Sequence, residues 1–145
     1  MPAVTRTDTE LSSTLRVSVM RLARRLRRER PDHGLGLTQL AALGTLERCG
    51  PMTPRALAEH EKVQPPSMTR TLASLESQGL VERNPHPTDG RQFIVEITAD
   101  GRGLMKEDRR RRDAWLAKTI AEHTTAEERA VLRAAAPLLD RLAQA

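Results

Sequence analysis

The chain has 145 residues, a length typical of one domain, and it carries 24 Lys and Arg against 19 Asp and Glu. The formal net charge is therefore +5, and 21 of the basic residues are arginine. Arginine forms forked hydrogen bonds to phosphate groups and guanine edges, so this balance favours an anionic partner. Hydrophobic residues make up 38% of the chain, which favours a globular core over disorder.

The rest of the composition excludes several classes of protein. Phe93 and Trp115 are the only large aromatic residues, which excludes a single-strand binder built on base stacking. Cys49 is the only cysteine, and the four histidines are scattered, so neither a disulfide nor a metal site is expected. No apolar run approaches the roughly 18 residues of a membrane helix. Met1–Glu10 lacks the apolar core of a signal peptide, so we expect a cytoplasmic protein. No cofactor is expected.

Apolar spacing and capping residues predict two helices in the first third of the chain. Residues 1–8 are expected to form a loose tail. Apolar residues at spacings of three and four then predict a helix that ends near Glu29; they are Leu11, Leu15, Val19, Leu22 and Leu26. Thr38 is the expected N-cap of a second helix that ends at Gly50.

Two further helices follow closely. Thr53 supplies a capping hydroxyl and Pro54 suits the first position of a short third helix. Pro65-Pro66 suit the first turn of a fourth, which Gly79 ends. The apolar side of the fourth helix consists of Met68, Leu72 and Leu75.

The second half predicts a hairpin and two long helices. Residues 80–82 and 93–97 are β-prone runs around a loop at 84–90 that is rich in turn formers. Thr98 is expected to cap a helix over 99–123. Thr125 and Glu128 form a capping-box pattern for a last helix, in which Pro137 predicts a kink or an early break.

Residues 53–97 combine a helix-turn-helix with a β-hairpin behind it. The turn at 60–64 joins the short helix to the fourth helix, which packs by one face and offers the opposite face to the major groove of DNA. The residues expected to face the groove are small, polar or basic: Gln64, Pro66, Ser67, Thr69, Arg70 and Ser74.

Other helix starts and the hairpin complete the expected DNA-binding set. Thr38 and Arg55 lie near helix N-termini, which favour phosphate. Arg91 at the hairpin tip is expected to reach the minor groove. Asp89 would repel phosphate if it were free, so we expect it to pair with Arg91 or Arg83.

The segment from Thr53 to Leu104 resembles the winged helix-turn-helix of MarR-family transcriptional regulators. The matching elements are Leu57-Ala58, Ser67 to Arg70, Leu75-Glu76, Gly79-Leu80-Val81, Asp89-Gly90-Arg91 and Thr98 through Gly101. The resemblance implies a mainly α fold with a small β-hairpin wing and flanking dimerisation helices. It implies one domain over 1–145, with the DNA-binding part at 38–98 and dimerisation helices at 9–30 and 99–143.

The resemblance also implies a function. Members of this family are homodimers that bind palindromic operators in double-stranded DNA, usually as repressors of nearby genes. Many release DNA when a small aromatic or phenolic effector binds. The arginines at 21–30 and 109–112 then fall on dimerisation helices, where solvation or ion pairing is favoured over DNA contact.

Two other classes of function are alternatives to a DNA-binding regulator. A winged helix can also serve as a protein-interaction module without sequence-specific DNA binding, and an apolar outward face on the fourth helix would favour that alternative. An enzyme is not expected, because the chain has no Gly-rich phosphate loop, nucleophile elbow or HExxH motif. Cys49 is expected to be a buried or partly buried thiol rather than a redox sensor.

Overall fold

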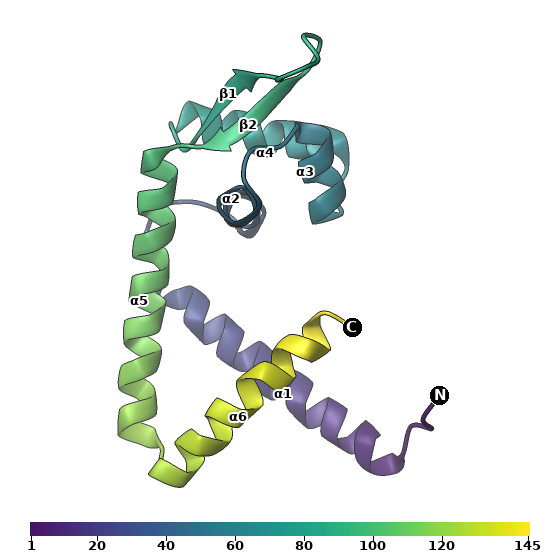
Figure 1. Cartoon of the computed structure of the whole chain (residues 1–145). Helices are drawn as coiled ribbons and strands as arrows, with labels where there is room; N and C mark the ends of the chain where they lie inside the picture. The colour runs from purple at the N-terminus through teal and green to yellow at the C-terminus, as the bar shows by residue number, and fades with distance from the viewer. The chain divides into compact units, whose positions relative to one another are not determined.

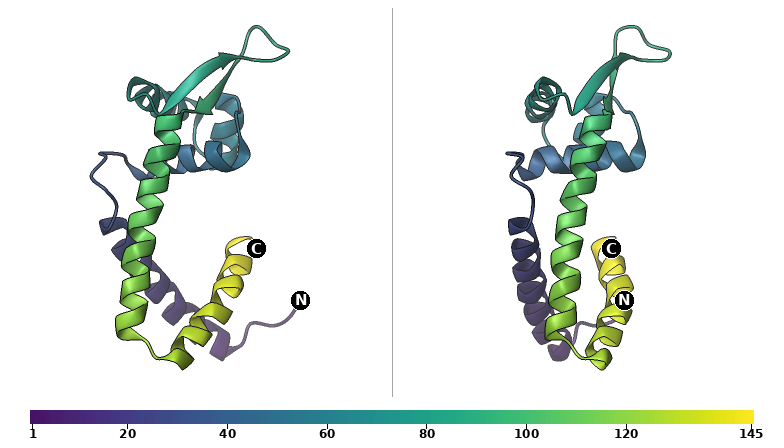
Figure 2. Two further views of the ribbon diagram at one scale, coloured as in Figure 1. Left: turned by 60° about the vertical axis from the view of Figure 1, so that its left-hand side comes forward. Right: turned by 90° about the vertical axis from the view of Figure 1, so that its left-hand side faces the viewer.

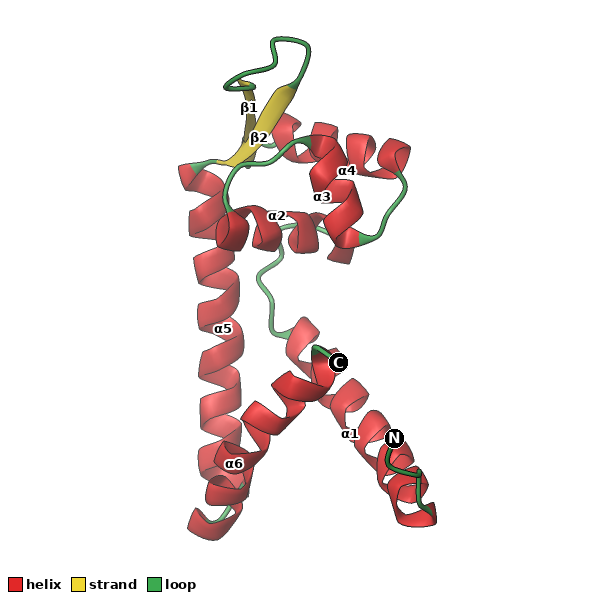
Figure 3. Cartoon of the chain, turned by 45° about the vertical axis from the view of Figure 1, so that its right-hand side comes forward, coloured by secondary structure: helices red, strands yellow, loops and turns green.

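The computed structural model describes residues 1–145 and contains six helices and one two-stranded sheet (Figure 1). In chain order the elements are α1 (Arg6–Arg28), α2 (Leu37–Cys49), α3 (Pro54–Glu61), α4 (Pro65–Ser77), β1 (Val81–Pro85), β2 (Phe93–Ile97), α5 (Ala99–His123) and α6 (Ala126–Ala143). Helices account for most of the chain (Figure 3), so the predicted mainly α fold with a small hairpin is confirmed.

The chain forms two compact units, each with its own internal packing. One unit comprises residues 31–109, from the segment before α2 to the first part of α5. The other comprises residues 1–30 and 110–145, which hold α1, the rest of α5 and α6.

The unit of residues 31–109 contains the hydrophobic core. Leu43, Leu57, Met68 and Leu75 are fully buried, so α2, α3 and α4 all meet there. The hairpin and α5 complete the core, which consists of Leu40, Ala42, Leu43, Leu46, Leu57, Ala58, Met68, Leu72, Leu75, Leu80, Val81, Val95, Ile97 and Met105. The predicted apolar side of α4 is therefore confirmed.

The other unit leaves its apolar faces exposed. Neither α1 nor α6 contains a buried residue. The exposed large apolar side chains include Leu11, Val19, Leu22, Val131, Leu138 and Leu142. The basic cluster of α1 makes local contacts: Arg25 forms an ion pair with Glu29, and its guanidinium lies 4.4 Å from the ring centroid of Trp115.

The predicted N-caps that have a capping side chain are confirmed for two helices. Thr53 Oγ1 accepts a hydrogen bond from Ala56 N (3.1 Å) at the start of α3. Thr125 Oγ1 accepts from Glu128 N (3.1 Å), and the Glu128 carboxylate accepts from Thr125 N (2.8 Å). These bonds satisfy backbone donors that the first helical turn leaves unpaired.

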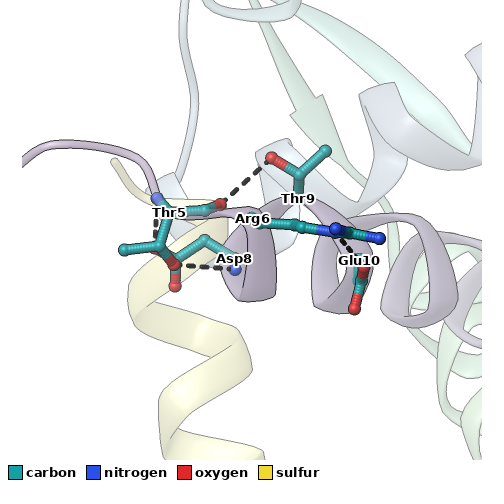
Figure 4. Close-up of polar contacts among 5 residues, drawn as sticks. All are labelled: Thr5, Arg6, Asp8, Thr9 and Glu10. Atoms are coloured by element: carbon teal, nitrogen blue, oxygen red, sulfur yellow. Dashed lines mark hydrogen bonds and ion pairs between the residues drawn. The ribbon is translucent and has the colours of Figure 1, made fainter.

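The start of α1 differs from the prediction. The expected tail over residues 1–8 is wrong, because Thr5 is an N-cap and the helix begins at Arg6 (Figure 4). Thr5 Oγ1 accepts from Asp8 N (3.1 Å) and Asp8 Oδ2 accepts from Thr5 N (2.9 Å), so a capping box with Asp in place of Glu extends the helix.

The start of α2 also lies earlier than predicted. Thr38 is not the N-cap but stands inside the first turn, and Gly36 is the N-cap. A glycine N-cap has no side-chain acceptor, so it leaves little signal in the sequence. Here the Gln39 side chain compensates, because its Oε1 accepts from Gly36 N (3.0 Å).

Three smaller predictions also need correction. α6 does not break at Pro137 and continues to Ala143; the carbonyl that proline leaves without a helical donor belongs to exposed Arg133, where water can reach it. β1 extends to Pro85, into the expected loop. Cys49 is exposed rather than buried, because α2 ends there and its side chain lies outside the core.

The hairpin and its loop, residues 81–97, form the wing. β1 and β2 pair antiparallel with Val81 opposite Ile97 and Pro85 opposite Phe93. In both views of Figure 2 the loop projects beyond the helices of its own unit. The base of the wing is held from the other side by Met52, which exchanges two backbone hydrogen bonds with Val95 (3.2 and 2.8 Å).

A half-buried histidine holds the segment before α2. His33 Nε2 lies 3.2 Å from Asp108 Oδ1 of α5, and His33 Nδ1 accepts from Leu35 N (3.1 Å). Its two ring nitrogens therefore have different partners, which fixes the proton on Nε2. This contact ties residues 31–36 to α5 within the same unit.

Thr98 joins α4, the wing and α5. Its hydroxyl donates to the Gly79 carbonyl (2.6 Å) and accepts from Gly101 N (3.1 Å), and its backbone N–H donates to the Leu80 carbonyl (3.0 Å). Gly79 ends α4 with a φ of 72°, a conformation that glycine adopts without strain. The predicted capping role of Thr98 is thus confirmed, together with contacts that the sequence did not indicate.

Gly101 permits this junction because it has no side chain. A Cβ atom there would lie 2.4 Å from the Leu80 carbonyl oxygen and 2.7 Å from Ile97 Cγ1. We expect Gly101→Ala to lower the free energy of unfolding by about 1–3 kcal/mol, as overpacking does. Urea denaturation measures it. In the matched control, Gly103→Ala on the same helix, nothing lies within 4 Å, so that variant should be unchanged or more stable. Equal effects of the two substitutions would contradict this account of the junction.

Candidate nucleic-acid interface

The turn between α3 and α4 has a strained residue where the helix direction changes. Lys62 has a φ of 54°, and it is the only residue other than glycine with a positive φ. Val63 N donates to the Ala58 carbonyl (3.0 Å), which closes the end of α3. Gln64 follows as the N-cap of α4, with Pro65 and Pro66 in its first turn as predicted.

The exposed face of α4 carries most of the predicted groove-facing residues. Gln64, Pro66, Thr69 and Arg70 are exposed, and Ser67 is half-buried. Arg70 Nη2 lies 3.4 Å from Ser67 Oγ, so these two side chains lie together on the surface. Thr69 Oγ1 donates to the Pro65 carbonyl (3.0 Å) and keeps its lone pairs available.

Ser74 lies on the same side of α4 as Ser67 and Arg70, but its side chain has partners within the fold. It is half-buried, and its hydroxyl oxygen accepts from Gln39 Nε2 of α2 (2.8 Å) and from Gln78 Nε2 (3.3 Å). Ala73 and Ser77 are exposed. At about 100° per residue they continue the face of Pro66 and Arg70.

The residues predicted near other helix starts are also accessible. Thr38 is exposed in the first turn of α2, although it does not cap that helix. The Arg55 side chain is 87% exposed, and its Nε lies 3.4 Å from Glu59 Oε1. Such an exposed i, i+4 pair is weak, so it leaves Arg55 able to contact phosphate.

Asp89 organises the wing loop, but not through an arginine side chain as predicted. Its Oδ1 accepts from the Arg91 backbone N–H (3.0 Å) and its Oδ2 accepts from Gln92 Nε2 (2.9 Å). These hydrogen bonds, that from Arg91 first, lower the pKa of the Asp89 carboxyl below its usual range. The Arg91 side chain is left exposed beside the loop.

Arg83 has two partners within the fold. Its Nε donates to Glu76 Oε2 of α4 (2.7 Å), and its guanidinium carbon lies 4.5 Å from the ring centroid of Phe93. This arginine therefore links the end of the recognition helix, α4, to the wing. It is half exposed, so one side still faces solvent.

Two hollows of about 300 Å³ each lie between the helices and the wing. Both include Pro54 and Phe93. One is completed by α4 and β1 and is lined by Pro54, Thr69, Leu72, Arg83 and Phe93. The other is completed by the wing loop and is lined by Thr53, Pro54, Arg55, Arg91, Gln92 and Phe93.

Comparison with known proteins gives this arrangement a family. The family model described as MarR family matches residues 35–93, from the segment before α2 to the first residue of β2. The chain is 49% identical over 132 residues to the HTH-type transcriptional regulator MT0903.1 of Mycobacterium tuberculosis, which covers 91% of this chain and 92% of that protein. The chain belongs to the MarR family.

Other relatives agree with this assignment. The multiple antibiotic resistance protein MarR of Salmonella typhimurium is 32% identical over 95 residues, 66% of each chain. A crystal structure of a transcriptional regulator from Pseudomonas aeruginosa superposes with a TM-score of 0.90 at 36% identity, covering 98% of this chain and 99% of that chain. The protein is thus a MarR-family transcriptional regulator with a DNA-binding winged helix and is not an enzyme. None of its helices has the length and apolar character to cross a membrane.

Lys62, the strained residue in the turn of this MarR-family helix-turn-helix, should lower the stability of the protein. Lys62→Gly should raise the free energy of unfolding by about 1 kcal/mol, because glycine adopts the left-handed conformation without the Cβ clash. Lys62→Ala keeps Cβ and removes only the charge, so it should leave stability within about 0.5 kcal/mol of the wild type. Urea denaturation distinguishes them. A glycine variant no more stable than the alanine variant would show that the turn is unstrained.

Proposed function

We propose that this MarR-family protein is a homodimeric repressor that binds a palindromic operator and is released by a small-molecule effector. The observation that carries the proposal is the exposed face of α4. It offers polar and basic groups with Arg70 at its centre, next to a wing whose Arg91 side chain is free of Asp89. Such a face suits a DNA groove and not an apolar protein partner, so it disfavours the protein-interaction alternative.

The residues of the interface divide into those that contact DNA and those that position the elements that do so. We assign contacts with base edges to the exposed residues of α4, led by Arg70 and including Gln64, Pro66, Ser67, Thr69, Ala73 and Ser77. Thr38 and Arg55 are placed to contact phosphate, and Arg91 to enter the minor groove. Ser74, Arg83 and Asp89 have partners within the fold, so we assign them to positioning α4 and the wing.

The exposed apolar faces of α1 and α6 support a dimer. Val131, Leu138 and Leu142 are 67%, 47% and 63% exposed, a pattern that is unfavourable in water. A second copy of the chain would bury these faces together with those of α1. A two-fold dimer would then place its recognition helices about one DNA turn, roughly 34 Å, apart.

The hollow lined by Pro54, Thr69, Leu72, Arg83 and Phe93 supports effector binding. It is largely apolar with one cationic side chain, which suits a small aromatic or phenolic molecule. An occupant there would touch both α4 and the wing, and so would alter their relative position. A screen for aromatic compounds that release the protein from DNA tests this part of the proposal.

Arg70→Ala should weaken binding to the operator by about 1–3 kcal/mol, the contribution of a forked base contact. Fluorescence anisotropy with DNA from the upstream region of the gene measures it. Arg6→Ala is the charge-matched control, because Arg6 is 93% exposed at the start of α1, and it should bind like the wild type. Equal losses of DNA affinity in both variants would show that Arg70 contributes only through its charge. Absence of any complex at low salt would contradict DNA binding itself.

Leu138→Glu should convert the dimer into a monomer, because a carboxylate at a buried apolar interface costs several kcal/mol. Sedimentation velocity measures the change, and circular dichroism should show unchanged helix content, since Leu138 is exposed within one chain. Gln144→Glu, beyond the end of α6, is the control and should remain dimeric. A wild-type protein that sediments as a monomer would contradict the dimer.

A further inference from the structure

The first half of the wing loop is held by one ring nitrogen. His86 Nδ1 accepts hydrogen bonds from the backbone N–H groups of Thr88 (3.2 Å) and Asp89 (3.0 Å), and the Thr88 hydroxyl lies 3.5 Å from the same atom. The His86 backbone N–H also donates to the Gln92 carbonyl across the loop (3.4 Å). The conformation that carries Arg91 therefore depends on an imidazole acting as an acceptor.

This acceptor role has a chemical condition. A ring nitrogen accepts a hydrogen bond only while it has no proton, so the structure requires neutral His86 with its proton on Nε2. The charged ring carries N–H groups on both nitrogens. Nδ1 would then point a proton at the N–H groups of Thr88 and Asp89, and the loop would lose these bonds. Histidine is the side chain whose charge changes between about pH 5 and 8.

The second half of the loop has a further set of bonds that do not involve the His86 ring, and it is joined to the first half through Asp89, whose backbone N–H donates to His86 Nδ1. The Asp89 carboxylate accepts from Arg91 N and from Gln92 Nε2. Because these bonds lower the pKa of Asp89, its carboxylate stays charged as the pH falls through the range in which histidine gains a proton. A proton on His86 Nδ1 therefore removes the bonds to that atom, while those to the Asp89 carboxylate remain.

The charged groups around the loop favour and oppose a proton on His86. The Asp89 carboxylate attracts the charged ring. Arg91 of the same loop, Arg55 of α3 and Arg83 of β1 are all cationic, and Arg55 and Arg91 line one hollow beside the wing. Phosphate groups brought by DNA would add negative charge near the arginines.

We propose that His86 makes operator binding pH-dependent, by presenting Arg91 in a fixed loop when its ring is neutral and releasing that loop when the ring is charged. The inference rests on the proposed contact of the wing with DNA. The effect of this histidine is regulatory. Acidification weakens the contact of the wing with DNA, while the contacts of α4 remain.

The decisive variant is His86→Asn. The asparagine Oδ1 takes the place of Nδ1 and accepts the same backbone N–H groups, but it cannot gain a proton. Anisotropy titrations with operator DNA at about pH 8 and about pH 5.5 compare the variants. We expect the wild type to lose about three- to tenfold more affinity than His86→Asn over this range. His123→Asn is the control, because exposed His123 lies at the end of α5, and it should keep the wild-type response.

A second measurement does not depend on DNA. In the free protein, the backbone amide signals of Thr88 and Asp89 in ¹H–¹⁵N spectra should shift together on acidification in the wild type and not in His86→Asn. Equal pH dependence of DNA affinity in both proteins, or unmoved amide signals in the wild type, would overturn the proposal. If no DNA binds at any pH, the proposed function fails, and the amide titration alone decides whether His86 controls the loop.

Discussion

The position of the DNA-reading surface depends on the hydrogen bonds of Thr98. This residue ends β2 and starts α5, and it binds the carbonyls of Gly79 and Leu80, which directly follow the recognition helix. A winged helix reads DNA with two separate elements, so their relative position must be fixed to within a fraction of a base step. Thr98 supplies that constraint at one point, and Gly101 allows α5 to approach closely enough for the bonds to form.

Under the proposed function, the polar side chains of α4 and the wing divide into those that contact DNA and those that support these two elements. Arg70 and Arg91 are exposed; Arg70 Nη2 lies 3.4 Å from Ser67 Oγ, and the Arg91 backbone N–H donates to Asp89 Oδ1. Arg83 has the same charge, but its Nε donates to Glu76 and its guanidinium group stacks on the Phe93 ring. Equal residue types therefore differ in role because of what surrounds them, and net charge alone does not identify the DNA surface.

Local chemistry explains which features were predictable from the sequence. Caps such as Thr53 and Thr125 act within one helical turn, so a few consecutive residues of the sequence are enough to predict them. The N-cap at Gly36 has no side-chain acceptor, and Ser74 is half-buried because Gln39 of another helix contacts it, so neither feature could be found from local spacing. The partners of Asp89 could not be singled out from the sequence, because the backbone N–H of Arg91 and the side-chain amide of Gln92 compete with nearby guanidinium groups for the same carboxylate.

The pairing of Met52 with Val95 changes the character of the wing. β2 has β1 on one side and Met52 on the other at its centre, so at that point it is an inner strand. The edge of β1 that faces away from β2 is open along its length, and there Glu82 and Arg83 are charged and Pro85 lacks a donor. Charged residues and proline on an edge strand oppose the addition of further strands. The protein can therefore extend a β-hairpin into solvent without offering neighbouring molecules a template for aggregation.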